Sequence, residues 1–461
     1  MIELELASLE NLLAAKWSLP VAQKFHGVST DTRTLKPGQL FVALKGPHFD
    51  AGLMLAEAQA KGAVAAIAEN GAKIPANFPV LTVQDTILAL GKLASNWRQR
   101  FTFPFVGITG SNGKSTTKEM TAAVLSLLGP VLKTEGNLNN LIGLPLTLFR
   151  LSAEHRVAVC EMGMNASGEI AAMTQILQPQ VGLITNVTSA HLEKLQTVEA
   201  VAEAKGELFA NMPANGVLLV NDEDPWAQKQ AAKYSQRKIH FGMQNTSDVK
   251  FGHVDMHGLD AMDLQLSVFG KELKLHLPLP GTHNIMNALS AIAVAVALDL
   301  DVQAAAHALE KFQAMPMRFE QVQLMNGVRL VNDCYNANPQ SMLEALRTVG
   351  SAKRAGRFVA VLGDMLELGE QTQSLHRELG ERVADHGVDE LFLLGNEAKN
   401  IADAAIKAGM SANRVHIFAQ VEELSQSLIA ELSAGDVCLV KASRGMKLER
   451  VVNALKQKFG A

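Results

Sequence analysis

The 461 residues of this chain suggest about three domains, since compact domains usually hold about 100–200 residues. Its 48% hydrophobic and 19% charged residues describe a globular protein with an ample core, and its net charge of −4 lacks the basic surface that nucleic-acid binding needs. The three cysteines are far apart, which suits a reducing cytoplasm better than a disulfide framework. No basic signal-peptide region and no apolar run of membrane-spanning length is found. We therefore expect a cytoplasmic protein with no nucleic-acid partner and no membrane span.

The first part of the chain, residues 1–83, holds short apolar segments between turn residues. The pattern predicts strands at 39–44, 64–68 and 80–83, with a helix over 51–61. We expect a small α/β domain here.

The second part, residues 84–314, begins with a predicted helix over 85–100, after which strands and helices alternate. Apolar β-branched runs separated by helices are typical of a mainly parallel, doubly wound sheet. Residues 249–279 alternate between apolar and polar, as antiparallel strands at a sheet edge do. The other predicted strands are 105–109, 131–133, 157–162, 181–186 and 217–221, and the closing helices are 283–298 and 301–312.

The third part, residues 315–461, starts near Pro316 and repeats the α/β alternation. Strands are predicted at 358–362, 390–394, 414–418 and 436–440, with helices between them. The chain therefore belongs to the α/β class, with three domains.

A glycine-containing loop directly follows the predicted strand 105–109. Its glycines allow backbone N–H groups to surround phosphate oxygens, Lys114 would bring a charge to the β- and γ-phosphates, and the hydroxyl of Ser115 or Thr116 would bind magnesium. The full P-loop motif has glycine where this chain has Ile108, so the segment alone also fits an ordinary turn. The candidate ATP-binding residues are Gly110, Ser111, Asn112, Gly113, Lys114, Ser115 and Thr116.

Polar residues follow other predicted strands of the second part. Glu161 lies at the carboxyl end of strand 157–162, and His191 follows strand 181–186. Lys205 lies shortly beyond, and Asn137 and Asn140 follow strand 131–133. Because the carboxyl ends of parallel strands share one edge of a sheet, these residues are predicted to lie near the phosphate loop. Singly, Glu161 also fits a helix cap, His191 a loop histidine and Lys205 a solvated helix face.

Several segments, in order and over nearly the whole chain, resemble the signatures of the Mur ligases, which build the peptide stem of bacterial cell-wall precursors. They are residues 29–33, 37–44, 109–116, 161–163, His191, Lys205, 281–288, 317–320 and 332–333. The resemblance implies a UDP-binding first domain, a P-loop ATPase-like second domain and a Rossmann-like third domain. It also implies ATP and a pair of Mg²⁺ ions. We expect a monomer, although the sequence itself leaves the oligomeric state open.

The resemblance further implies an acyl-phosphate mechanism. The γ-phosphoryl group of ATP would pass to the terminal carboxylate of UDP-N-acetylmuramoyl-tripeptide, and an amine would then displace phosphate. The implied catalytic residues are Lys114, His191, Lys205 and Arg318. Magnesium would be held by Ser115, Thr116, Glu161, His191 and, if carbamylated, Lys205; as a plain lysine, Lys205 would contact phosphate instead.

The substrate sites are implied residue by residue. Asn284 would contact adenine, Arg318 the γ-phosphate, and Asp333 the ribose or the magnesium site. The UDP substrate would be bound by Ser29, Thr30, Asp31, Arg33, Asn137 and Asn140.

Residues 333–342, 362–369 and 441–447 resemble the branch of the family that adds D-alanyl-D-alanine. The branch that adds a diamino acid commonly carries Asp-Asn-Pro-Arg where this chain reads Asn-Ala-Asn-Pro-Gln at 336–340. Neutral Gln340 removes the bidentate contact that arginine makes with an extra carboxylate. The implied amine-substrate residues are Asn336, Asn338, Gln340, Ser341, Lys441 and Arg444.

Other assignments stay open at this point. A Mur-type ligase with a different amine fits most of the signatures. A P-loop NTPase that drives motion would use the phosphate loop and Glu161 but would leave the third-domain segments unexplained. A binding protein without catalytic activity would be expected to lack Lys114 or Glu161. Lysine and diaminopimelate are both compatible as the third residue of the tripeptide.

Overall fold

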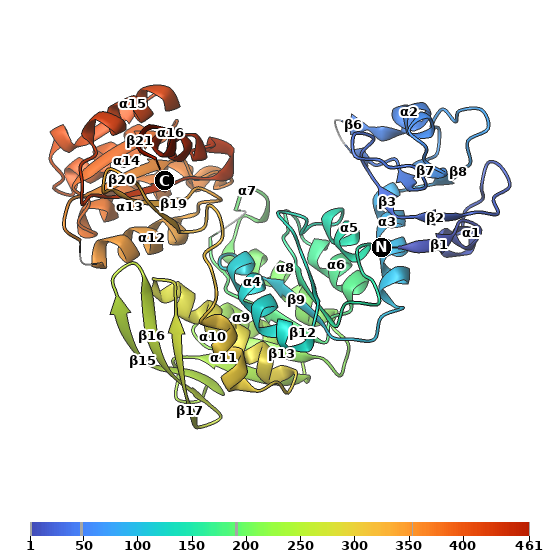
Figure 1. The fold of residues 1–461 in the computed structure, drawn as a ribbon, viewed down its shortest axis with the longest axis horizontal. Helices are drawn as coiled ribbons and strands as arrows, with labels where there is room; N and C mark the ends of the chain where they lie inside the picture. The colour runs from blue at the N-terminus through green and yellow to red at the C-terminus, as the bar shows by residue number, and fades with distance from the viewer. Residues whose placement is uncertain (1, 47–48, 190–191, 353, 461) are drawn as a thin grey trace.

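The computed structural model describes residues 2–46, 49–189, 192–352 and 354–460. The N-terminal part (blue in Figure 1) and the C-terminal part (orange to red) lie on opposite sides of a central part. The sheets are mainly parallel and alternate with helices, so the expected α/β class is confirmed. The domain boundaries after residues 83 and 314 stay predictions. Among the described helices, none has the length and apolar character needed to cross a membrane.

The N-terminal part is built on a small parallel sheet in the order β3-β4-β7-β8. The predicted strands are confirmed, and the predicted helix starts as a 3₁₀ turn, η1 (Ala51–Met54), before α2 (Leu55–Ala60). The antiparallel pair β1 (Glu3–Glu5) and β2 (Lys24–His26) was not predicted, because three residues are too few to show a period. The other elements are α1 (Ser8–Leu13), β3 (Val28–Ser29), β4 (Leu40–Val42), β5 (Lys45–Gly46), β6 (Phe49–Asp50), β7 (Ala65–Glu69) and β8 (Val80–Val83).

The central sheet has the order β10-β11-β9-β12-β13-β14-β15-β16-β17. It is parallel as far as β15 and antiparallel beyond, as the alternating pattern at 249–279 predicted. Strand β14 was not predicted, because Arg237, Lys238 and His240 interrupt its apolar residues. The strands are β9 (Phe105–Thr109), β10 (Val131–Lys133), β11 (Val157–Glu161), β12 (Val181–Ile184), β13 (Val217–Asn221), β14 (Arg237–Gly242), β15 (Val249–His257), β16 (Ala261–Val268) and β17 (Lys271–Leu277).

Helices cover both faces of this sheet, because its parallel strands send apolar side chains to both sides. Phe105 packs into one core while Val106 and Ile108 pack into the other. The first core contains α3 (Thr86–Arg98), α5 (Gly143–Leu148), α6 (Glu169–Leu177), α8 (Val198–Ala210) and α9 (Pro225–Ala231). The second contains α4 (Lys114–Leu125), α10 (Thr282–Ala297) and α11 (Val302–Leu309).

Helix α3 connects the N-terminal part to the central part. Asp85 caps its start by accepting hydrogen bonds from the N–H groups of Ile87 and Leu88. At its end, the buried Arg98 donates to the carbonyls of Leu177 and Gln178, which close α6. The same hydrophobic core continues from the first sheet through α3 into the central sheet, so the two parts share packing.

The C-terminal sheet has the order β18-β19-β23-β20-β21-β22 and is parallel except for β18. The four predicted strands are confirmed within a residue at each end, whereas β18 and β19 were not predicted as strands. The strands are β18 (Glu320–Gln323), β19 (Arg329–Asp333), β20 (Phe358–Gly363), β21 (Glu390–Leu394), β22 (Val415–Phe418) and β23 (Val437–Lys441). The helices are α12 (Pro339–Ser351), α13 (Thr372–Asp385), α14 (Ala398–Lys407), α15 (Val421–Glu431) and α16 (Glu449–Phe459).

Candidate functional site

Strands of the central and C-terminal sheets end at one cavity of about 790 Å³. Lys205, Gly110 and the predicted UDP-binding residues Ser29, Thr30, Asp31 and Arg33 are not among the residues that line it. His191 lies outside the described residues. The predicted residues that line the cavity are Ser111, Asn112, Gly113, Lys114, Ser115, Thr116, Asn137, Asn140, Glu161, Asn284, Arg318, Asp333, Asn336, Asn338, Gln340, Ser341, Lys441 and Arg444.

The loop between β9 and α4 requires its two glycines. Gly110 has φ +150°, and a Cβ there would lie 1.8 Å from the Thr185 hydroxyl. Gly113 has φ +78°, and a Cβ there would lie 2.5 Å from the Asn287 side-chain oxygen. Because α4 begins directly afterwards at Lys114, its first N–H groups have no acceptor within the helix and suit an anion.

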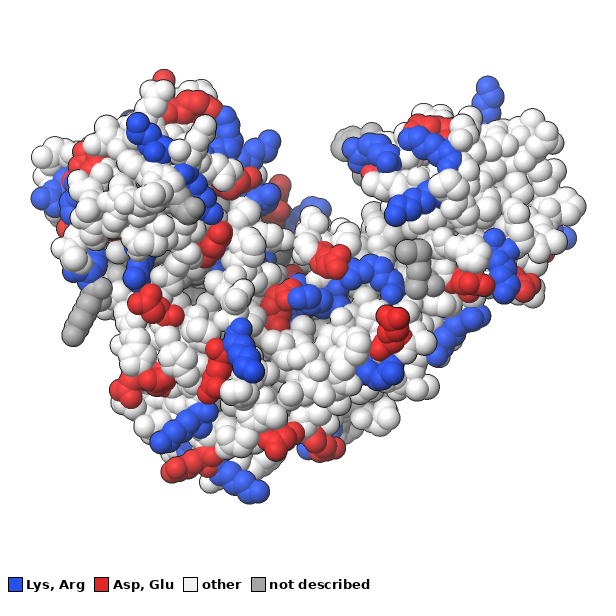
Figure 2. All heavy atoms as spheres, in the orientation of Figure 1, with Lys and Arg blue, Asp and Glu red and all other residues white. Residues whose placement is uncertain are grey.

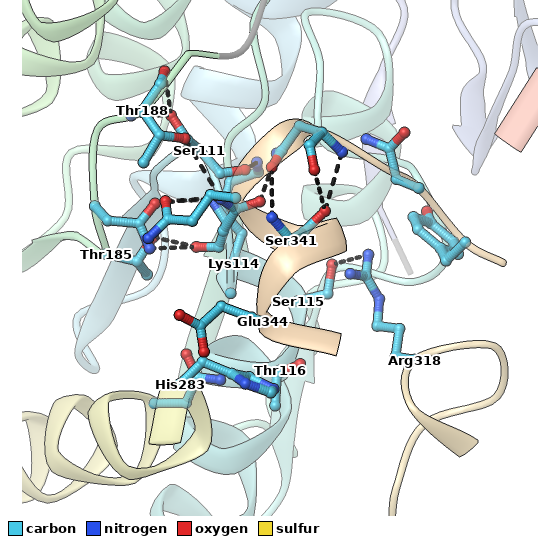
Figure 3. A pocket seen from close by; sticks show the side chains of 18 of the residues that line it. Ser111, Lys114, Ser115, Thr116, Thr185, Thr188, His283, Arg318, Ser341 and Glu344 are labelled. Carbon is cyan, nitrogen blue, oxygen red and sulfur yellow. Dashed lines mark hydrogen bonds between the residues drawn. The ribbon is translucent and has the colours of Figure 1, made fainter. Parts of the chain in front are cut away.

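Residues that follow β12 hold this loop in place. Ser111 N–H donates to the Asn186 carbonyl at 2.9 Å, and Asn112 N–H donates to the Asn186 side chain at 2.8 Å. The Thr185 hydroxyl donates to the Asn112 carbonyl at 2.6 Å, and Thr188 N–H donates to the Ser111 hydroxyl at 2.9 Å (Figure 3). Thr185 and Asn186 were not predicted as site residues, although their position at the end of a parallel strand was a usable signal.

Lys114 bends back over its own loop. Its Nζ donates to the carbonyls of Gly110 at 2.8 Å and Ser111 at 3.2 Å. Burial lowers the pKa of Lys114; nearby Glu161 opposes this shift, and Arg318 adds to it. Nearby anionic groups therefore do not fully balance the charge of the ammonium group, which suits it to bind a polyphosphate.

Ser115 links the two sheets. Its hydroxyl donates to Glu161 Oε2 at 2.7 Å and accepts from Arg318 Nη2 at 2.7 Å (Figure 3). The other oxygen of buried Glu161 accepts from Asn139 at 2.8 Å. The pair of a carboxylate and a hydroxyl provides oxygen ligands of the kind that magnesium prefers. Within the described residues, no cluster of three or more acidic, histidine or cysteine side chains forms a complete metal site.

Lys205 projects from α8 and is only 1% exposed. Burial lowers its pKa well below the usual range, and Lys114 lowers it further. No hydrogen bond or ion pair joins its side chain to any described residue. This environment excludes the solvated helix face that the sequence left open, and it favours a neutral amine.

Two predicted amine-site cations differ sharply in environment. Lys441, at the end of β23, is 2% exposed, and its Nζ donates to Asp333 at 2.6 Å and to the Asn336 carbonyl at 3.1 Å. Arg444 is exposed and makes a 3.4 Å ion pair with Glu449. Of the two, only Arg444 offers an accessible cation to a substrate carboxylate.

Residues at the start of α12 touch the phosphate loop across the cavity. Asn338 caps this helix by accepting from Ser341 N–H, and its side-chain nitrogen donates to the Asn112 side chain at 2.6 Å. Exposed Gln340 accepts from Asn112 at 3.5 Å. The predicted amine-binding segment and the predicted ATP-binding loop are therefore direct neighbours.

The start of α10 also lines the cavity, next to α12. Buried Asn284 donates to the Pro280 carbonyl at 2.7 Å and accepts from Asn287 at 3.0 Å. The neighbouring His283 was not predicted as a site residue, and its buried Nδ1 has no hydrogen-bond partner among the described residues. Burial lowers the pKa of His283. The carboxylate of Glu344 acts on this imidazole electrostatically, and Figure 3 draws the two side chains close together.

The predicted UDP-binding loop forms a separate feature in the N-terminal part. The guanidinium of Arg33 donates hydrogen bonds from Nε and Nη2 to the carboxylate of Asp31. These bonds lower the pKa of Asp31 to about 2. Buried Ser29 donates to the Asp31 carbonyl at 2.9 Å. Figure 2 shows an open gap between the N-terminal and C-terminal parts, with Lys and Arg gathered on the inner edge of the N-terminal part.

Comparisons with known proteins give a consistent result. Family models described as "Mur ligase family, catalytic domain", "Mur ligase middle domain" and "Mur ligase, glutamate ligase domain" match residues 24–98, 108–295 and 317–444. The Bacillus subtilis protein named UDP-N-acetylmuramoyl-tripeptide--D-alanyl-D-alanine ligase is 36% identical over 431 residues, or 93% of each chain. This chain belongs to the Mur ligase family.

Solved Mur ligase structures agree. MurF from Acinetobacter baumannii is similar with a TM-score of 0.90 at 30% identity over 99% of each chain. MurF from Thermotoga maritima, solved in complex with ADP, is similar with a TM-score of 0.84 at 29% identity, covering 94% of this chain and 97% of that one. The resemblance to Mur ligases and the three-domain architecture are confirmed, while the residue roles stay predictions.

We expect Lys114→Ala to reduce ATP-dependent turnover by about a hundredfold or more, as removal of one preorganised charge typically does. The fold should survive, because the loop is fixed by its glycines and by Asn186 rather than by the lysine. Steady-state kinetics and a thermal melt measure both effects. Lys407→Ala, which removes an exposed lysine at the end of α14, is the control. An unchanged rate in Lys114→Ala would place the phosphate site elsewhere.

Proposed function

We propose that this chain is an ATP-dependent ligase that joins D-alanyl-D-alanine to UDP-N-acetylmuramoyl-tripeptide, giving the pentapeptide, ADP and phosphate for peptidoglycan synthesis. The observation that carries the proposal is the direct contact between the phosphate loop and the segment that precedes and begins α12, through Asn112 and Asn338. The names of the relatives that match along nearly the whole chain support it. An ATP site and an amine site this close suit the transfer of an activated carboxylate.

The chemistry requires activation, because a carboxylate is a poor electrophile. One oxygen of the tripeptide's terminal carboxylate attacks the γ-phosphorus, and ADP leaves with the electron pair of the broken P–O bond. The dipeptide amine then attacks the acyl carbon, and phosphate leaves from the tetrahedral intermediate while the amine loses a proton. An α-amine has a pKa of about 7.7–8.0, so a useful fraction is neutral without a strong base.

The main task of the protein is to hold two anions, ATP and carboxylate, in contact. The N–H groups at the start of α4 and the ammonium of Lys114 would bind the phosphates. Arg318, which reaches Ser115 from the C-terminal part, would balance charge on the transferred group. Closing of the two parts around these groups would also exclude water from the acyl phosphate.

Magnesium fits the oxygen set at this site. Ser115, Thr116 and Glu161 would hold it together with phosphate oxygens, and it would supply charge neutralisation for the phosphates. Lys205 would join this set only as a carbamate, which a buried neutral amine can form with carbon dioxide.

The amine site would lie between the start of α12 and the loop after β23. Gln340 brings no positive charge, which suits a dipeptide without a charged side chain. Exposed Arg444 would bind the dipeptide carboxylate, while buried Lys441 would order the segment from Asp333 to Asn336. We also propose that the UDP part binds the N-terminal part near Ser29 and Arg33, and that the enzyme acts as a cytoplasmic monomer.

Phosphate release should require both the tripeptide substrate and the dipeptide, because closing of the site would exclude water, so that the γ-phosphoryl group passes only to the carboxylate and the acyl phosphate reacts only with the amine. The protein is incubated with ATP, magnesium, UDP-N-acetylmuramoyl-tripeptide and D-alanyl-D-alanine, and each substrate is omitted in turn. Phosphate release and the mass of the pentapeptide product are measured. Vigorous ATP hydrolysis without either substrate would favour an NTPase that drives motion.

Lys205→Ala should be inactive, and short carboxylic acids should partly restore its activity by supplying the missing carboxylate oxygens. A surface lysine would cost less than about 0.5 kcal/mol of stability and leave the rate intact. Rates are measured with and without added acetate or formate. Lys233→Ala, which removes a partly exposed lysine paired with Glu203, is the control for general effects of these salts.

Inactivity of Lys205→Ala without rescue would favour direct contact of a plain lysine with phosphate. Full activity would remove Lys205 from the site.

Gln340→Arg should raise the KM for D-alanyl-D-alanine more than the KM for ATP. The new guanidinium would present an unpaired charge to a dipeptide that has no carboxylate at that point. Gln340→Met, which keeps the length without the charge, separates this effect from loss of the Asn112 contact. A rise confined to the KM for ATP would place the segment at the nucleotide and refute the assignment.

A further inference from the structure

Arg318 sits at the centre of a strained turn. The residues on both sides of it, Met317 (φ +61°) and Phe319 (φ +52°), have left-handed backbones although neither is glycine. Non-glycine residues adopt this conformation only where surrounding contacts impose it, often at functional sites. Here Phe319 N–H donates to Asp333, and Tyr335 N–H donates to the Met317 carbonyl at 3.1 Å. The segment 333–335 therefore imposes the turn that presents Arg318.

The side chain of Tyr335 also contacts the guanidinium group of Arg318 directly. Arg318 Cζ lies 3.9 Å from the centroid of the Tyr335 ring, and its Nη2 donates to the Ser115 hydroxyl. A cation stacked on an aromatic face is attracted by the negative face of the ring. Within the described residues, the Tyr335 hydroxyl makes no hydrogen bond, so its ring is the part with a defined partner.

We propose that Tyr335 is the positioning residue for Arg318. Its ring orients the guanidinium toward Ser115. There the guanidinium would contact the terminal phosphate of the nucleotide. This role rests on the proposed function only in placing that phosphate beside Ser115. It also links the two substrate sites, because Tyr335 directly precedes the segment of Asn336 and Asn338, which begins the proposed amine site.

If Tyr335 acts by positioning Arg318, its loss should change the affinities for different nucleotides in a specific pattern. An ATP analogue that resists hydrolysis carries the terminal phosphate, whereas ADP lacks it. If Tyr335 acts through Arg318, loss of the ring weakens the analogue and leaves ADP unchanged. If the ring instead contacts base or ribose, both nucleotides weaken alike, and if it only supports the fold, the melting temperature falls.

The test compares Tyr335→Leu with Tyr335→Phe, which keeps the aromatic face and loses only the hydroxyl. Titration calorimetry with the analogue and with ADP, both in the presence of magnesium, gives the dissociation constants, and a thermal melt reports the fold. We expect Tyr335→Leu to bind the analogue roughly tenfold more weakly, while Tyr335→Phe stays within about twofold of the unchanged protein. In an Arg318→Ala background, Tyr335→Leu should add no further loss.

Equal weakening of ADP and analogue, or an additional loss in the Arg318→Ala background, would overturn the proposal. So would unchanged analogue binding in Tyr335→Leu, or a similar drop in melting temperature in both Tyr335 variants. These measurements need no ligase turnover. Loss of the binding difference therefore counts against the role of Tyr335, whereas absence of the pentapeptide product counts against the proposed ligase.

Discussion

The hydrogen bond between Arg318 and Ser115 is the contact on which the candidate site depends. It joins residues that lie 203 positions apart in the sequence, Ser115 in helix α4 of the central part and Arg318 in the turn before β18 of the C-terminal part. Each sheet is parallel at its centre, so each brings its loops to one edge, and the two edges meet at one cavity. Together with the hydrogen bond from Asn338 to Asn112, this contact holds the two edges against each other, so phosphate binding by the α4 loop and amine binding by the α12 segment could act on one carboxyl group.

The charges around this contact are unbalanced in a way that suits the proposed substrates. Lys114 interacts with the carboxylate of Glu161 and lies near the cations Arg318 and Lys205, and burial lowers the pKa values of both lysines. Each cation also disfavours the charged form of its neighbour, since Arg318 acts on Lys114 and Lys114 acts on Lys205. Binding of a polyphosphate would relieve this repulsion. The site is therefore preorganised to bind an anion, because the cationic side chains are in position before the anion arrives.

The sequence predicted those parts of the fold that depend on local pattern. Strands such as Phe105–Thr109 were predicted to the residue, because this strand is buried on both faces, is largely apolar and is followed directly by Gly110. Strands β14 and β18 were missed, because polar residues interrupt them and only their neighbours in the sheet make them strands.

The same distinction holds for the site. The glycine loop and Glu161 were predicted because they follow recognisable strands. Thr185, Asn186 and Tyr335 were missed, because their roles arise from contacts over distances in sequence that no short motif covers. The sequence around Tyr335 does not indicate the role of its aromatic ring, because its partner Arg318 belongs to a separate turn.

The buried pair of Lys441 and Asp333 explains how the C-terminal sheet controls the direction of Arg318. Lys441 binds one oxygen of Asp333, and the other oxygen accepts from Phe319 N–H in the strained turn. Removing one partner of a buried pair typically costs about 3–5 kcal/mol, because the remaining charge is left uncompensated. The pair therefore fixes the end of β19 relative to β23 more firmly than packing alone. Through Asp333, the core of the C-terminal sheet reaches the turn that carries Arg318 to Ser115.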